Sequence, residues 1–169
     1  MATTLHRGTA IQLSGDLPVV GQAAPNFRFV LADLAEGELN DLSGKIKVLM
    51  CMPSLDTSTC ALETKTFNKK LEGIEGLEAL VITNDLPFAM RRFCETEGIV
   101  NVRSASDFRY HDFSQYYGVQ LCGGLLKGLH ARAVFVIDAQ NVIRYTELVP
   151  NVSEEPNYDA VLKAVNQLR

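Results

Sequence analysis

The residues best suited to chemistry lie in the segment Pro53-Ser54-Leu55-Asp56-Thr57-Ser58-Thr59-Cys60. An apolar run before it, Ile46 to Met52, predicts a buried strand, and the segment after it, Ala61 to Leu71, predicts a helix. Cys60 therefore belongs to the first turn of a helix, where unpaired backbone N–H groups carry partial positive charge. This position favours the thiolate, which is the nucleophilic form of cysteine.

Nearby side chains both help and oppose ionisation of this thiol. Thr57 lies where the helix begins, so its hydroxyl could cap the helix or donate to the sulfur. Pro53 fixes its own φ and gives the loop a rigid entry. Asp56 and Glu63 bring negative charge, so a thiolate needs a cation from elsewhere in the fold. Without that cation, Cys60 is an ordinary packed thiol.

A second cysteine, Cys94, lies in a predicted helix from Pro87 to Glu97. It either packs beneath this helix or resolves a sulfenic acid on Cys60 by forming a disulfide with it. Arg91 and Arg92 would favour its thiolate. A disulfide needs Cα atoms within about 7 Å, and two helices would hold the sulfurs apart. We therefore expect local unfolding of one helix when the bond forms.

The candidate cation is Arg132, which opens the apolar strand predicted over Ala131 to Asp138. A guanidinium cannot lose its proton in a protein, so burial requires an anion beside it. One possible partner is Glu147 on the neighbouring strand. The other is the Cys60 thiolate, in which case Arg132 would offset the charge of Asp56.

Length and composition limit the classes of protein that the chain can represent. Its 169 residues predict one domain over 1–169, and a net charge of −4 gives no support for nucleic-acid or membrane-surface binding. No apolar stretch of signal-peptide or membrane-span length occurs, so a cytoplasmic location is expected.

The chain has no Cys-x-x-Cys pair and no tight Cys/His cluster, so no structural zinc site is expected. His6, His111 and His130 are expected at the surface or in local hydrogen bonds.

Strands that alternate with helices predict an α/β fold with a mixed central sheet. A small N-terminal β-hairpin within residues 1–20 is expected, with strands Thr9 to Leu13 and Leu17 to Val20. Asn84 or Asp85 should cap the helix that Gly98 ends. The remaining expected elements are a strand over Leu77 to Thr83, an extended piece over Ile99 to Arg103, a short helix over Asp112 to Tyr117, a strand over Val142 to Leu148 and a final helix with Tyr158, Val161, Leu162, Val165 and Leu168 on one face.

Taken together, these motifs resemble one known family. The pattern Pro53-x-x-x-Thr57-x-x-Cys60, with a strand-initial Arg132, is similar to the active site of the peroxiredoxins. The segment Gly21 to Phe27 resembles the entry segment of that family. The sequences around Arg92-Phe93-Cys94 and from Leu126 to Val134 are similar to those of its thiol peroxidase branch.

The resemblance implies a thioredoxin-like fold and the reduction of hydrogen peroxide and organic hydroperoxides. It implies that Cys60 is the peroxidatic cysteine, that Cys94 resolves it within the same chain, and that Thr57, Arg132 and Pro53 complete the site. It also implies recycling by thioredoxin and a homodimer. No metal, flavin or nicotinamide cofactor is expected. Leu125 replaces a proline that is usual in the branch, and Cys51 and Cys122 have no role in the family.

Three other functions share some of these features. A thioredoxin-type disulfide oxidoreductase would have the same fold but requires Cys-x-x-Cys, and position 57 is threonine. A non-enzymatic redox sensor could use the same two cysteines. A binding domain with inert thiols is the third alternative, and peroxide consumption separates these possibilities.

Overall fold

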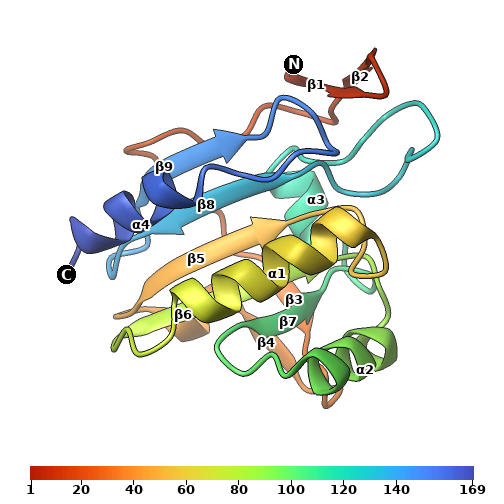
Figure 1. The fold of residues 1–169 in the computed structure, drawn as a ribbon. Coiled ribbons are helices and arrows are strands. Elements are labelled where there is room, and N and C mark those ends of the chain that lie inside the picture. The colour runs from red at the N-terminus through yellow and green to blue at the C-terminus, as the bar shows by residue number, and fades with distance from the viewer.

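The computed structural model describes residues 1–169, which form nine strands, four α-helices and one 3-10 turn (Figure 1). The strands are β1 Thr3–His6, β2 Thr9–Gln12, β3 Arg28–Val30, β4 Glu36–Glu38, β5 Ile46–Cys51, β6 Leu77–Thr83, β7 Arg103–Ser106, β8 Ala133–Ile137 and β9 Ile143–Leu148. The helices are α1 Ser58–Lys70, α2 Pro87–Glu97, α3 Asp112–Tyr116 and α4 Tyr158–Asn166, with the 3-10 turn over Leu39–Leu42.

Seven strands form one mixed sheet in the order β4-β3-β7-β6-β5-β8-β9. The central strands β7, β6 and β5 are parallel, and antiparallel strands complete both edges. The predicted α/β fold with a mixed sheet is therefore confirmed. Parallel β5 and β6 end at the same edge of the sheet, so α1 and α2, which follow them, begin near one another.

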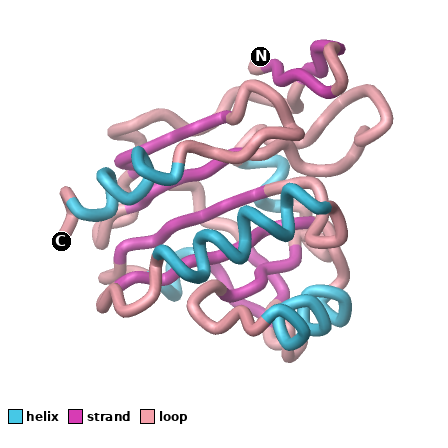
Figure 2. Tube along the Cα trace, in the orientation of Figure 1, coloured by secondary structure: helices cyan, strands magenta, loops and turns pink.

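Helices cover both faces of this sheet, and β5 shows how its residues divide between them (Figure 2). Val48 and Met50 join the core beneath α1, α2 and α4. Leu49 and Cys51 point the other way and pack with α3 in a second core. This alternation follows from the two-residue period of a strand, and it places Cys51 and Cys60 in different cores.

The N-terminal hairpin is present, and the strand predicted over Thr9 to Leu13 is observed as β2, but the predicted second strand and the predicted turn are wrong. Thr3–His6 pairs with Thr9–Gln12 across a two-residue turn at Arg7-Gly8. Both turn residues have positive φ, 50° and 79°, which suits the right-handed twist of a tight hairpin. The second predicted strand, Leu17 to Val20, contains Pro18, which cannot donate to a ladder, and it forms no strand.

Two further predicted boundaries are wrong. Leu86, and neither Asn84 nor Asp85, precedes α2, because the Asp85 carboxylate accepts hydrogen bonds from Leu55 N and Thr83 Oγ1 instead. The extended piece expected over residues 99–103 becomes a strand only at Arg103, where pairing with β6 starts. Gly98 does end α2, with φ of 66°. None of the helices has the length and apolar character needed to cross a membrane.

Candidate functional site

Cys60 lies in the first turn of α1 and has no exposed surface. The pairing of β8 with β5 brings Arg132 to it, since Ala133 lies opposite Cys51 at the end of β5. Arg132 Nη2 donates to Cys60 Sγ over 3.4 Å. The sequence proposed two partners for this guanidinium, and the structure places the Cys60 sulfur beside it.

The Arg132 side chain is 2% exposed and uses all three of its guanidinium nitrogens. Nη1 forms an ion pair of 2.7 Å with Glu63 Oε2, and Nε donates to the carbonyl oxygen of Val152 over 2.8 Å. The carboxylate partner is therefore Glu63, and the alternative pairing with Glu147 is wrong. Glu147 instead accepts from the Tyr145 hydroxyl and from the backbone N–H of Asn157, the residue before α4.

Glu63 and Cys60 share one buried cation. Burial raises the pKa of Glu63 to about 7, while the charge of Arg132 acts in the opposite direction. Glu63 Oε1 has no hydrogen-bond partner. Because ionising both acids would place two anions around one guanidinium, a proton on Glu63 leaves more of the Arg132 charge for the sulfur.

Thr57 occupies the residue position before α1 with extended backbone, φ −95° and ψ 150°. Its hydroxyl donates to Ser54 O over 3.1 Å, so it neither caps the helix nor contacts the sulfur here. Both hydroxyl contacts predicted for Thr57 are therefore absent from this structure.

Pro53, Thr57 and Arg132 do come together in the lining of one cavity of about 340 Å³. The other lining residues are His6, Arg7, Ser58, Thr59, Leu125, Leu126, Val152 and Ser153. Cys60 is buried and does not line this cavity, but Arg132, which does line it, contacts the Cys60 sulfur.

Cys94 lies on α2, half-buried, and both Cys60 and Cys94 are free thiols. Burial raises the pKa of Cys94, and the charge of Glu95 adds to the effect. The expectation that Arg91 and Arg92 favour its thiolate is wrong, because neither arginine offsets this rise, and Arg91 Nε pairs with Glu95 at 3.0 Å. The two cysteines contact the same core, Cys60 as a member and Cys94 packed against it.

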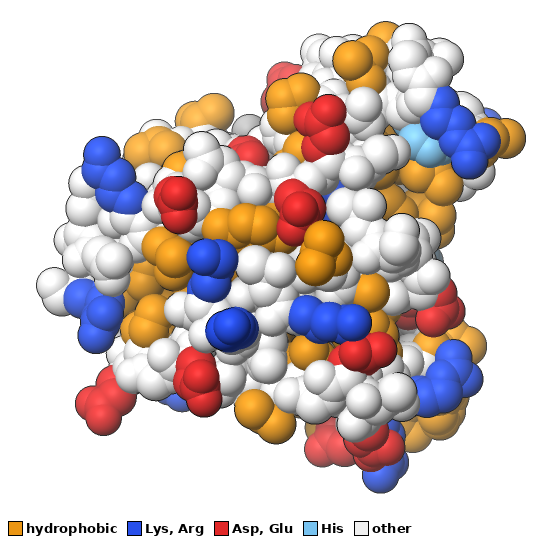
Figure 3. All heavy atoms as spheres, in the orientation of Figure 1, with side chains coloured by type: hydrophobic (Ala, Val, Ile, Leu, Met, Phe, Trp, Pro, Cys, Tyr) orange, Lys and Arg blue, Asp and Glu red, His pale blue; other side chains and the backbone are white.

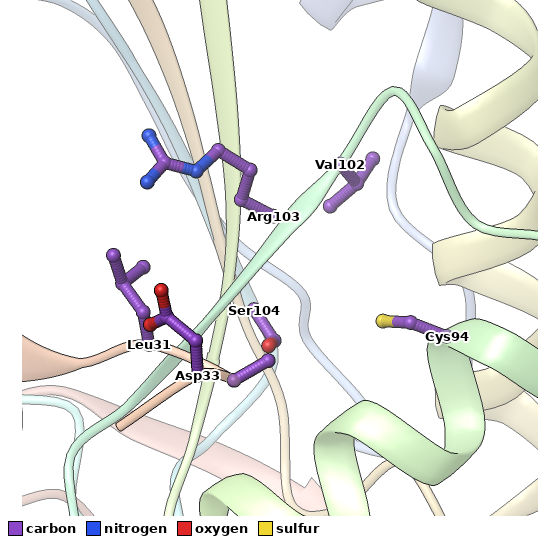
Figure 4. A pocket seen from close by; sticks show the side chains of 7 residues that line it. Leu31, Asp33, Cys94, Val102, Arg103 and Ser104 are labelled. Atoms are coloured by element: carbon purple, nitrogen blue, oxygen red, sulfur yellow. The ribbon is translucent and has the colours of Figure 1, made fainter. Parts of the chain in front are cut away.

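The Cys94 sulfur points from α2 into a second cavity, of about 270 Å³, beside Val102 and Ser104 of the neighbouring β7 region (Figure 4). Leu31, Asp33 and Arg103 complete the part of the lining that the view labels. The thiol therefore borders a cavity that lies between α2, the start of β7 and the residues that follow β3.

The remaining cysteines have opposite environments. Cys51 is fully buried in the core on the α3 side, and this burial raises the pKa of its thiol. Its Sγ lies 3.3 Å from the carbonyl oxygen of Ala131. Cys122 is exposed.

His130 was missed as a buried residue. It has no exposed surface, and its Nε2 lies 3.0 Å from Asp107 Oδ2. In the sequence, only its position next to an apolar strand indicated burial.

No group of three or more His, Cys, Asp or Glu side chains is placed to hold a metal ion.

Comparison with known proteins gives a consistent result. The model of the redoxin family matches residues 19–162. A thiol peroxidase from Leptospira interrogans is 51% identical over 98% of both chains, and a thiol peroxidase from Aquifex aeolicus is 45% identical over 99% of both.

Two solved structures have closely similar folds. The crystal structure of a peroxiredoxin-like protein from Aquifex aeolicus superimposes with a TM-score of 0.95 at 44% identity, covering 99% of this chain and 97% of the other. A thiol peroxidase from Chromobacterium violaceum has a TM-score of 0.90 at 26% identity, covering 98% and 95%.

Proposed function

The chain belongs to the redoxin family and is a peroxiredoxin-type peroxidase with a thioredoxin-like fold, and we propose that Cys60 is the sulfur that attacks the peroxide. The observation that supports this most strongly is the 3.4 Å contact between Arg132 Nη2 and Cys60 Sγ. A cation at that distance favours the thiolate, and the first turn of α1 adds unpaired N–H groups on the same side.

The reaction is a two-electron transfer from sulfur to the O–O bond. The Cys60 thiolate attacks one peroxide oxygen, the O–O bond breaks, and the other oxygen leaves with a proton as water or alcohol. Sulfur is oxidised to the sulfenic acid. Arg132 and backbone N–H groups of α1 stabilise the charge that moves to the leaving oxygen. Thr57 takes part when its hydroxyl turns from Ser54 O towards the peroxide, and Pro53 holds the loop that carries it.

The second step forms a disulfide within the chain. The Cys94 thiol attacks the sulfenic sulfur of Cys60, and water leaves. Cys60 is closed off from solvent and Cys94 faces a different cavity, so this step requires local unfolding at the start of α1 or in α2. A dithiol partner then opens the bond by exchange, and we assign that role to thioredoxin. We also propose that the chain works as one domain, in a homodimer, in the cytoplasm.

Replacing Cys60 by serine tests this assignment. Cys60→Ser should abolish peroxide consumption in the presence of thioredoxin and its reductase, because no other thiol is hydrogen-bonded to Arg132. Cys51→Ser is the matched control, since it removes a buried thiol from the opposite face of the sheet, and it should retain turnover. Substantial turnover in Cys60→Ser would refute the assignment. A wild-type protein that peroxide oxidises once, without turnover, would be a redox sensor and not a peroxidase.

A further inference from the structure

The turn between β6 and α2 lies between the two elements that carry the proposed reacting cysteines. β6 ends at Thr83, and α2, which carries Cys94, follows after residues 84–86. β5 runs parallel to β6, and the loop over residues 53–57 that follows β5 leads to Cys60. This loop, called the Cys60 loop below, and the β6–α2 turn are therefore neighbours at one edge of the sheet.

Asp85, in the β6–α2 turn, binds the Cys60 loop through both of its carboxylate oxygens. Oδ1 accepts from Ser54 Oγ over 2.7 Å, and Oδ2 accepts from Leu55 N over 2.8 Å and from Thr83 Oγ1 over 2.7 Å. Hydrogen bonds to a carboxylate are about twice as strong as those between neutral groups. Leu55 is 3% exposed, so its N–H loses its partner in a buried place if Asp85 is removed. This contact, the Asp85 clamp, ties the loop to the end of β6.

Further hydrogen bonds connect the clamped loop to the start of α1. Ser54 Oγ accepts from Asp56 N over 3.1 Å, and Ser54 O accepts from Thr57 N and Thr57 Oγ1, each over 3.1 Å. Thr57 precedes α1, and its carbonyl oxygen accepts from Ala61 N over 3.0 Å. Because Cys60 lies in that first turn, the position of its sulfur depends on the clamped loop.

Asp85 itself is fixed to the sheet. Its N–H donates to Thr83 Oγ1 over 2.9 Å, and its carbonyl oxygen accepts from Ser106 Oγ on β7. The preceding residue, Asn84, donates from Nδ2 to Gly128 O over 3.1 Å. The Asp85 carboxylate is therefore a fixed point, and the Cys60 loop is the part that moves when the clamp opens.

The second half of α1 is also fixed. Asn68 Oδ1 accepts from Val100 N over 3.0 Å and from Asn101 N over 2.7 Å, in the segment that follows α2. α1 presents basic side chains to solvent (Figure 3), and one of them, Lys65, pairs with Glu97 Oε2 at 3.0 Å. Within α1, movement is therefore confined to the first turns, which adjoin the Cys60 loop.

From these contacts we propose that Asp85 is a positioning residue that keeps Cys60 in its buried place. Its bonds to the Cys60 loop break when Cys60 moves to meet Cys94. The inference rests on the proposed roles of the two cysteines. Asp85 forms no hydrogen bond to either sulfur, so it acts only through the loop. It thereby sets how long the sulfenic acid persists before the Cys94 thiol attacks it, forms the S–S bond and releases water.

A second peroxide competes for the same sulfenic acid. The sulfenic sulfur attacks the O–O bond of this peroxide, gains one oxygen and becomes the sulfinic acid, while the peroxide is reduced to water. A closed form that persists longer gives this reaction more time. The peroxide concentration that converts half of the protein to the sulfinic acid therefore rises in proportion to the rate of disulfide formation, and it reports on the clamp.

The test uses the full-length, pre-reduced protein with hydrogen peroxide and no reductant, and mass spectrometry of acid-quenched samples. Asp85→Ala should form the Cys60–Cys94 disulfide about tenfold faster than the wild type, because bonds to a charged group no longer have to break. The peroxide concentration that gives half sulfinic acid should rise by the same factor. The first oxidation of Cys60 should stay within about twofold, since an open state of about 1% that becomes about tenfold more populated leaves most molecules closed.

A smaller change and a matched control accompany this variant. Ser54→Ala removes one bond of the clamp and should raise both quantities by about threefold, which keeps the inference testable if Asp85→Ala folds poorly. The control is Asp138→Ala. The Asp138 carboxylate accepts from two backbone N–H groups and from Arg144 Nε, at the end of β8 that lies opposite the start of β5. This variant should lose stability in urea denaturation without any change in disulfide formation.

The contrary results can be told apart. Equal rates of disulfide formation in Asp85→Ala, Ser54→Ala and the wild type would overturn the inference alone, since α2 would then move without the Cys60 loop. An acceleration in Asp138→Ala as large as that in Asp85→Ala would also overturn it, because a general loss of stability would be the cause. Failure of the wild type to form a Cys60–Cys94 disulfide would overturn the proposed function and the inference with it.

Discussion

The Glu63 carboxylate and the Arg132 guanidinium form an ion pair of 2.7 Å that is closed off from solvent. Glu63 lies three positions after Cys60, on the same side of α1, so one guanidinium contacts both side chains. Arg132 therefore contributes both to the stability of the fold and to the reactivity of Cys60. Substitutions can separate these two contributions.

Arg132→Met should impair both properties. The rate of single-turnover oxidation should fall by about 100-fold or more, because a donor to the thiolate and to the leaving oxygen is lost. The thiolate ultraviolet absorbance at neutral pH should decrease. The free energy of unfolding should fall by about 3–5 kcal/mol, because Glu63 is left buried without its cation.

The double variant Arg132→Met/Glu63→Gln separates these effects. It removes the unpaired charge, so most of the stability should return, whereas the rate should stay low. Chemical denaturation and stopped-flow oxidation measure the two quantities. Wild-type oxidation rates in the double variant would show that the guanidinium does not assist Cys60.

The raised pKa of Glu63 should produce a pH dependence of stability. The folded state holds a proton that the unfolded chain releases near pH 4.5, so the free energy of unfolding should fall as pH rises from there to about 7. Above that pH this contribution is lost. Glu63→Gln should remove the slope, whereas Glu72→Gln, at an exposed position, should retain it. Denaturation curves at several pH values that show parallel profiles for wild type and Glu63→Gln would contradict the assignment.

Local patterns in the sequence predicted much of the fold. The apolar runs of β5 and β6 and the Pro87 start and Gly98 end of α2 were predicted nearly to the residue, because propensity and capping agree there. The hairpin was misplaced because Ser14-Gly15-Asp16 is as good a turn signal as Arg7-Gly8. Which of two such turns joins the strands depends on the contacts that the strands make with the rest of the fold.

The site was less predictable, since its contacts join distant parts of the chain. The sequence offered Arg132 as the cation, but not that Glu63, 69 positions away, would share it. It also gave no sign that His6 and Arg7 lie over the same cavity as Thr57, because that depends on the bonds of the hairpin to residues 150–152. The hydroxyl of Thr57 had several possible acceptors, and the nearby Ser54 carbonyl is the one it contacts.

The two cysteines without a proposed role should differ sharply in accessibility. A maleimide reagent should modify Cys122 rapidly in the native protein, because its side chain is exposed. Cys51 should react only when the protein unfolds, since it is buried in the core on the α3 side. Peptide mapping of the labelled protein at increasing urea concentration measures this difference. Rapid native labelling of Cys51 would contradict the placement of its side chain.

Cys94→Ser should leave the first step intact and stop the second. The variant should consume one equivalent of peroxide and accumulate the sulfenic acid on Cys60, which a dimedone probe would trap. No intramolecular disulfide should form, because the remaining thiols lie in the opposite core or on the exposed loop. Cys122→Ser is the control and should form the disulfide normally. An unchanged yield of disulfide in Cys94→Ser would exclude Cys94 as the resolving thiol.

The central claim is that peroxide oxidises Cys60 and that Cys94 then captures the oxidised sulfur. Intact-mass measurement and peptide mapping of the wild-type protein before and after one equivalent of peroxide test it most directly. The account predicts a loss of two hydrogens and one linked pair of peptides that contain Cys60 and Cys94. A link from Cys60 to Cys51 or Cys122, or oxidation that leaves Cys60 reduced, would contradict it.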